Sequence, residues 1–119
     1  MRYVDGFVLP VPKKKIPAYL RLARKAGKIW REYGALEYRE CVGEDLAPGV
    51  GVPFLKLAKA KRGETVLFAW IVYKSRAHRD RVLAKVMKDK RLADSMDPKS
   101  MPFDGKRMIY GGFKVLVDL

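Results

Sequence analysis

The segment Thr65–Tyr73 is apolar on both strand parities and carries no charged residue, which leaves few ways to fold it. A strand with one face in water alternates apolar and polar residues, whereas a strand that is apolar throughout is covered on both faces. The segment Tyr3–Val11 has the same character, since Val4 and Val8 lie on one parity and Phe7 on the other. The sequence therefore predicts two central strands in a sheet that needs cover on both faces.

Periodicity and the positions of proline and glycine predict the other regular elements. Apolar residues recur at helical intervals over residues 14–33 and 76–88, and Ser75 is a suitable N-cap for the second helix. Residues 35–42 alternate in the manner of a half-exposed strand. Residues 108–119 are predicted to form the last strand, in which consecutive glycines indicate a bulge or a close backbone approach.

Two segments between these elements are rich in turn-forming residues. Residues 43–64 are predicted to be a loop in which residues 54–58 form a small strand or an extension of a turn. Residues 91–96 are predicted to add one more helical turn. Residues 97–107 are predicted to be a loop that packs down on the protein and can serve as a lid.

The predicted elements follow one another as β-α-β-β-α-β, in one domain over residues 1–119. Right-handed crossovers turn this order into a four-stranded antiparallel sheet with both helices on one face, which is a ferredoxin-like α+β fold. Two helices cover only one face of such a sheet, and no further element is expected for the other face. We therefore predict that a second copy of the chain covers it and that the protein is a homodimer.

The composition excludes several kinds of chemistry within one chain. Cys41 and His78 are the sole cysteine and histidine, so neither an internal disulfide nor a zinc site of Cys and His can form. Gly49 and Gly51 lack the Lys-Ser/Thr sequence of a phosphate loop, and no metal or cofactor is expected. No apolar run approaches the ~20 residues of a membrane span, and the N-terminus has no signal-peptide pattern. We therefore expect a cytoplasmic protein without a membrane partner.

The chain is strongly basic, with 26 Lys and Arg against 13 Asp and Glu and a net charge of +13. Basic residues concentrate in the first predicted helix and just before it, where they would attract phosphate backbones. This pattern supports nonspecific binding of RNA or another polyanion, and the alternative is a solvated helix face. Asn and Gln, the usual readers of adenine, are absent. The candidate residues are Lys13, Lys14, Lys15, Arg21, Arg24, Lys25, Lys28 and Arg31.

Asp5 is a carboxylate on the same parity as Tyr3, Phe7 and Leu9 of a predicted central strand. A carboxylate in this position loses solvation unless it is paired or hydrogen-bonded. Two interpretations remain open: a general base with a raised pKa in a ligand cavity, or a structural contact with a basic side chain or a backbone donor. The second interpretation is favoured.

His78 is the one side chain of ordinary pKa that could carry protons near neutral pH. It lies in the first turn of the second predicted helix, between Arg76 and Arg79, and a partly exposed helix residue is the alternative to a catalytic role. Cys41 and His78 would form a thiolate and base pair only if the fold brought them together. A single buried cysteine without function is the favoured interpretation for Cys41.

Aromatic side chains are spread over the predicted strands and the first helix. They could line an apolar pocket for an aromatic or polycyclic ligand, and the alternative is that they belong to the core or to a dimer interface. The candidates are Tyr3, Trp30, Tyr38, Trp70, Tyr73 and Tyr110.

Several blocks of the sequence resemble the YbaA-like family, domain of unknown function 1428, over almost the whole chain. The resemblance implies a dimeric α+β barrel in which two ferredoxin-like sheets pack face to face. No reaction or ligand comes with it, and the basic first helix is a departure from what the resemblance implies. The similar blocks are Tyr3–Pro12, Gly34–Tyr38, Trp70–Tyr73, Ser75–Asp80 and Met101–Phe113.

Proteins of that barrel superfamily include cofactor-free monooxygenases, haem-dependent enzymes and binding proteins, so the resemblance narrows shape more than chemistry. Our first hypothesis is a homodimer that binds a small molecule, with oxygenase-like chemistry without a cofactor as its enzymatic form. The second hypothesis is binding of RNA or another polyanion through the first helix. The sequence leaves open whether the protein is an enzyme.

Overall fold

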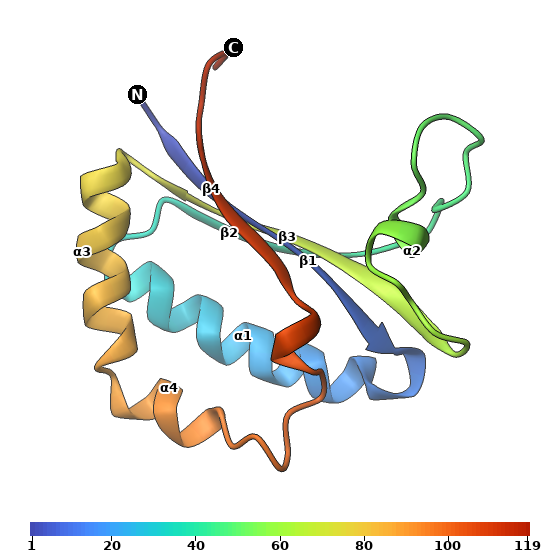
Figure 1. Ribbon diagram of the computed structural model, residues 1–119. Helices are drawn as coiled ribbons and strands as arrows, with labels where there is room; N and C mark the ends of the chain where they lie inside the picture. The colour runs from blue at the N-terminus through green and yellow to red at the C-terminus, as the bar shows by residue number, and fades with distance from the viewer.

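Four antiparallel strands form one sheet in the order β2-β3-β1-β4, in a computed structural model that describes all residues 1–119 (Figure 1). The two central strands pair along their whole lengths, from Tyr3 opposite Tyr73 to Pro12 opposite Glu64. This confirms the predicted α+β architecture and the central position of the two apolar strands. The strands are β1 (Tyr3–Pro12), β2 (Glu37–Val42), β3 (Glu64–Tyr73) and β4 (Ile109–Lys114).

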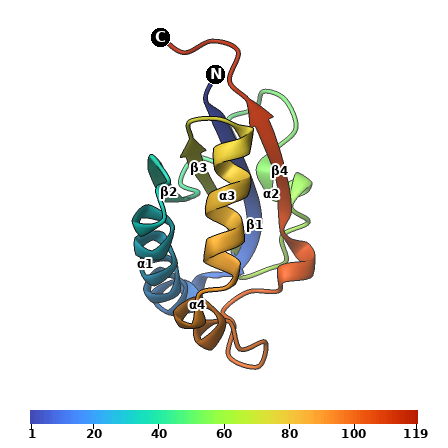
Figure 2. The ribbon, with the colours of Figure 1, turned by 90° about the vertical axis from the view of Figure 1, so that its left-hand side faces the viewer.

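Three helices lie on one side of this sheet, α1 (Ile16–Glu32), α3 (Arg76–Met87) and α4 (Lys90–Ser95) (Figures 1 and 2). A short 3-10 helix, Lys13–Lys15, leads into α1. The Ser75 hydroxyl accepts the backbone N–H of His78 and so caps α3, as predicted. The extra helical turn expected after α3 is α4. None of the helices combines the length and apolar character that crossing a membrane requires.

The strand parity decides which side chains meet the helices. Odd-numbered residues of β1 and β3 face α1 and α3, where Leu9 and Leu67 pack with Tyr19, and Ile71 packs with Val82. Even-numbered residues of the same strands face the other side of the sheet. The core therefore lies between the sheet and the helices.

Helix α1 lies unusually close to β2 at Gly27. A Cβ atom built on Gly27 would lie 2.8 Å from Cδ1 of Tyr38, which is closer than real side chains approach. Glycine at this position lets the ring of Tyr38 pack directly against the helix backbone.

Two predicted elements differ from the observed structure. Residues 54–58 contain a short helix, α2 (Phe54–Leu57), and not a strand, because the Pro53 carbonyl accepts the N–H of Leu57 and closes a helical turn. Strand β4 ends at Lys114 and not at the last residue. Beyond it, Val115 donates to the Arg2 carbonyl, and no strand continues the pairing.

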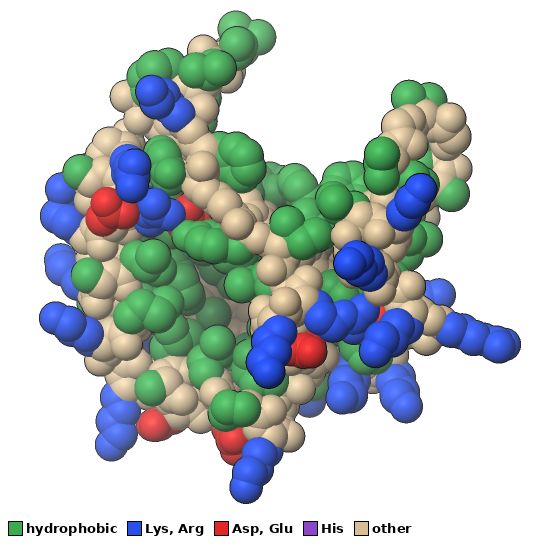
Figure 3. Space-filling view, viewed as in Figure 1, with side chains coloured by type: hydrophobic (Ala, Val, Ile, Leu, Met, Phe, Trp, Pro, Cys, Tyr) green, Lys and Arg blue, Asp and Glu red, His purple; other side chains and the backbone are tan.

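The second face of the sheet is covered at one end and open at the other. Val8 and Val66 pack with Ala58, which follows α2, so the expectation that no element reaches this face is wrong at that end. The remaining part, which we call the open sheet face, consists of Phe68, Trp70, Ile109 and Phe113. Figure 3 shows hydrophobic side chains gathered there, between two segments that rise above the sheet: the C-terminus and the loop before α2.

Candidate functional site

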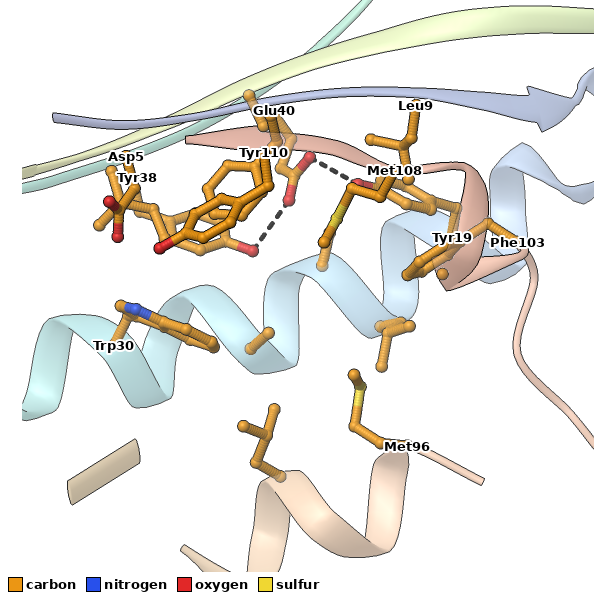
Figure 4. Close-up of a pocket in the computed structure, with 18 of the residues that line it drawn as sticks. Asp5, Leu9, Tyr19, Trp30, Tyr38, Glu40, Met96, Phe103, Met108 and Tyr110 are labelled. Atoms are coloured by element: carbon orange, nitrogen blue, oxygen red, sulfur yellow. Dashed lines mark hydrogen bonds between the residues drawn. The ribbon is translucent and has the colours of Figure 1, made fainter. Parts of the chain in front are cut away.

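A cavity of about 380 Å³ lies between the sheet and the three helices, and it opens beside β4. Figure 3 shows it as a hollow with hydrophobic side chains around it, and Figure 4 shows its interior. Strands β1 and β3 form its roof, and α1 forms one long wall. Its volume is within the range of small-molecule sites, and most of its lining residues are hydrophobic.

Glu40 is the polar centre of the cavity. Tyr19 of α1 donates to its Oε1 and Tyr38 of β2 donates to its Oε2, each at 2.8 Å (Figure 4). Burial raises the pKa of Glu40 above its ordinary value, and the two hydroxyl donors act in the opposite direction. Burial and the nearby carboxylate raise the pKa of both tyrosines, so their hydroxyl groups stay protonated and serve as donors.

Asp5 lies at another part of the cavity wall and has its own cation. Its side chain is 1% exposed, and Arg79 Nη1 donates to Oδ1 at 2.7 Å. The same nitrogen donates to the Tyr110 hydroxyl at 3.0 Å, and the guanidinium lies 4.9 Å from the centre of the Tyr3 ring. Burial raises the pKa of Asp5, and Arg79 lowers it. This arrangement matches the structural interpretation of Asp5, a contact with a basic side chain.

The predicted pocket aromatics divide between the two faces of the sheet. Trp30, Tyr38 and Tyr110 line the cavity. Tyr73 lies behind them, and its hydroxyl accepts from Trp30 Nε1 at 3.0 Å. Tyr3 contacts Arg79 outside the cavity lining.

Trp70 requires a correction, because it lies on the open sheet face and not in the cavity. It occupies an even position of β3, so its side chain points away from the helices, and its Nε1 donates to Glu37 at 3.3 Å. The composition of Thr65–Tyr73 identifies a covered strand, but it does not say which parity meets the helices.

His78 and Cys41 lie apart and form no catalytic pair. His78 Nδ1 accepts the backbone N–H of Lys74 at 2.9 Å in the turn between β3 and α3, outside the cavity lining. Burial, together with Lys74 and Arg81, lowers the pKa of His78. Cys41 pairs with Phe68 across β2 and β3, on the opposite face of the sheet. The structure contains no group of three or more Asp, Glu, His or Cys side chains that could hold a metal ion.

Methionine forms an apolar part of the cavity wall. Of the five methionines in the chain, four line the cavity: Met87, Met96, Met101 and Met108. They come from the ends of α3 and α4 and from the segment between α4 and β4, part of which is the loop predicted as a lid. Arg107 fixes the end of that loop to β3, since its Nη1 contacts Glu64 Oε2 at 2.7 Å.

The sequence prediction missed Glu40 and the methionine wall. Glu40 has the same signal as Asp5, since it shares a parity with Leu36 and Tyr38 in the predicted strand 35–42. The methionines carry no such signal, because they lie on three segments whose approach depends on the tertiary fold.

The strand order, the helices on one side and the cavity between them define an α+β protein of ferredoxin-like topology with an internal apolar site. Two solved structures share this fold. A NIPSNAP family protein from Agrobacterium tumefaciens str. C58 matches with a TM-score of 0.59 at 15% identity, over 96% of this chain and 92% of that chain. An uncharacterized NIPSNAP domain protein from Burkholderia xenovorans matches with a TM-score of 0.56 at 13% identity, over 95% and 93%. At these identities the likeness concerns the fold alone.

The chain belongs to the DUF1428 family, whose model, "Protein of unknown function (DUF1428)", matches residues 2–105. It is also 46% identical to the uncharacterized protein YbaA of Escherichia coli strain K12, over 118 residues that cover 99% of each chain. These matches confirm the resemblance found in the sequence blocks.

Proposed function

We propose that this protein binds an apolar small molecule in the cavity between the sheet and helices α1, α3 and α4. The observation that carries the proposal is the cavity itself, about 380 Å³ in volume and lined mostly by hydrophobic side chains. Protein interiors are close-packed, so an apolar space of this size inside a small fold has a large packing cost unless it is filled. Its few polar groups, Glu40 with two tyrosine donors and Asp5 with Arg79, would orient the bound molecule.

Filling the cavity should weaken binding. N-phenyl-1-naphthylamine, a neutral dye that fluoresces in apolar surroundings, should bind the native protein, and Ala26→Phe should lower its affinity at least about tenfold because the ring occupies the cavity. The measurement is a fluorescence titration, with thermal unfolding to confirm that the variant is folded. Ala77→Phe, on the exposed side of α3, is the matched control and should bind as the native protein does. Equal dye affinity in native protein and Ala26→Phe would contradict the proposal.

The enzymatic form of this proposal is oxygenation without a cofactor. A base removes a proton from a carbon atom of the bound molecule, the carbanion combines with O2, and the proton returns to the peroxide oxygen that forms. Glu40 suits the role of base better than Asp5, because Asp5 is held by Arg79 and Glu40 is in no ion pair. Oxygen uptake in the presence of a bound compound, and its loss in Glu40→Gln, is the result expected of this form.

The proposal includes a homodimer joined through the open sheet face. Phe68, Ile109 and Phe113 are 42%, 39% and 61% exposed on that face. Contact of these apolar side chains with water costs free energy, and burial against another apolar surface removes that cost. The face carries no Lys or Arg on β1, β3 or β4, and its one basic residue on β2, Arg39, lies 3.9 Å from Glu37, so two strongly basic chains can meet there with little direct repulsion. The C-terminal residues Leu116 and Val117, 79% and 73% exposed, stand beside it and would contact the second copy.

Polyanion binding is the second candidate function. The observation that favours it is that the eight basic residues predicted from the sequence, in α1 and the 3-10 helix before it, are all exposed. They lie on the helix side of the sheet, so a dimer formed through the open sheet face would leave them accessible (Figure 1).

If α1 binds RNA, its affinity for unrelated RNAs should fall steeply with salt. Replacing Lys25 and Lys28 with Ala should reduce the slope of log affinity against log salt by about 2, because each lysine that neutralises a phosphate contributes about 1. Fluorescence anisotropy with a labelled RNA measures this. The same change at Lys56 and Lys61, exposed on the other side of the molecule, should leave the slope unaltered. Absence of RNA binding at low salt would eliminate this candidate.

A further inference from the structure

The two carboxylates of the cavity differ in one respect: the protein supplies a cation for Asp5 and none for Glu40. Arg79 contacts Asp5 at 2.7 Å, whereas Glu40 has two neutral phenol donors and no Lys, Arg or His within ion-pair distance. The chain has 26 Lys and Arg, so this is not for lack of basic residues. A carboxylate in apolar surroundings without a cation is costly, because it loses hydration without full compensation.

Glu40 also keeps free capacity to accept hydrogen bonds. An ionised carboxylate has about four acceptor positions, and the tyrosines occupy one position on each oxygen. Its side chain is only partly buried and lines the cavity, so a bound molecule can reach it. Figure 4 shows the carboxylate held between Tyr19 and Tyr38.

Another part of the cavity wall has the contrary character. It is built from Met87, Met96, Met101 and Met108, whose long unbranched side chains adjust to apolar groups of different shape. Glu40, by comparison, is fixed in place by two hydrogen bonds from aromatic side chains. The cavity thus combines one fixed acceptor with one adaptable apolar wall.

We infer that the cavity selects apolar amines, with the ligand's ammonium group donating to Glu40 and its hydrocarbon part against the methionine wall. The ligand then supplies the positive charge that no side chain of the protein places beside Glu40. A neutral alcohol of the same shape would form a weaker hydrogen bond, and a carboxylate would be repelled. Because the acceptor is fixed and the wall adaptable, the head group is selected more strictly than the hydrocarbon part. This inference rests on the proposed binding function and gives Glu40 a role in ligand binding, as an alternative to its role as the base in the enzymatic form.

Three probes of similar shape test the inference by calorimetric titration: 2-(2-naphthyl)ethylamine, 2-(2-naphthyl)ethanol and the anion of 2-naphthaleneacetic acid. The amine should bind at least about tenfold more tightly than the alcohol, the difference expected of a charge-assisted hydrogen bond, and the carboxylate should show no binding. Glu40→Gln keeps the size of the side chain and an oxygen acceptor, and it should remove the preference for the amine. Glu37→Gln, on the same strand but the opposite face, should leave the preference unchanged.

Thermal unfolding separates lost selectivity from lost structure. Glu40→Gln should unfold close to the temperature of the native protein, because removing a charge from an apolar site offsets the loss of one of the two tyrosine hydrogen bonds. Equal binding of amine and alcohol by the native protein, or an amine preference that survives in Glu40→Gln, would overturn the inference while leaving the binding function intact. If none of the three probes binds and the dye N-phenyl-1-naphthylamine does not bind either, the proposed binding function itself is wrong.

Discussion

Arg79→Met is expected to lower the free energy of unfolding by about 3 to 5 kcal/mol, because it leaves Asp5 buried without its cation. The Asp5 side chain is 1% exposed and that of Arg79 is 12% exposed, so water can replace little of the lost interaction. Methionine retains the apolar stem of arginine, so the substitution leaves little empty space. The loss of stability therefore comes mainly from the missing charge and its hydrogen bonds. Equilibrium unfolding in urea, followed by circular dichroism, measures the difference.

The second partner of Arg79 provides the control. Asp80 contacts Arg79 Nε at 2.8 Å, but the Asp80 side chain is 58% exposed. Asp80→Asn should therefore cost less than about 1 kcal/mol, as solvent-exposed ion pairs usually do. The double variant Asp5→Leu with Arg79→Met should regain part of the stability, because no unpaired charge remains inside. If Arg79→Met and Asp80→Asn lower the free energy of unfolding by the same amount, the buried Asp5–Arg79 pair contributes no more to stability than the exposed pair.

Phe68→Glu is expected to convert a dimer of twice 13.6 kDa into a monomer. The residue lies on β3 in the open sheet face and is 42% exposed in one protomer, so glutamate is tolerated there until a second copy approaches. Two such carboxylates in an apolar interface would lose their hydration. The free energy gained by burying a standard interface of about 800 Å² per partner does not readily offset this cost. Light scattering coupled to size-exclusion chromatography measures the mass.

Leu20→Glu is the matched control for this change. Leu20 is 41% exposed, almost the same as Phe68, but it lies on α1 on the other side of the sheet. This variant should keep the mass of a dimer. A native protein that elutes with the mass of one chain at micromolar concentration would refute the dimer proposal, whatever the variants do.

The central strands and the two main helices are predictable from the sequence because each has a long and consistent apolar pattern. Helix α2 is not, since its four residues give no helical period and a proline precedes them. The extent of β4 is also not predictable. The apolar residues Leu116 and Val117 continue the pattern of the strand, but the pairing of β4 with β1 ends at Lys114, opposite Tyr3.

The candidate site could be predicted in part, and the limit was the assignment of strand faces. Asp5 stands out in a sequence of apolar residues, so its burial and the need for a partner could be foreseen. Which basic residue serves it could not, because Arg79 is 74 residues away along the chain. The prediction of Trp70 as a pocket residue is wrong, since either parity of an apolar strand can meet the helices and the sequence does not say which one does.

Gly27 has a consequence for any attempt to reshape this site. Because the Tyr38 ring occupies the space that a Cβ atom would need, even alanine at position 27 would force the ring or the helix to move. Tyr38 and Tyr19, the latter on the same helix, hold the two oxygens of Glu40, so either movement would disturb the acceptor. Remodelling the binding specificity should therefore start at the methionines, whose replacement changes the shape of the cavity without altering the spacing between α1 and β2.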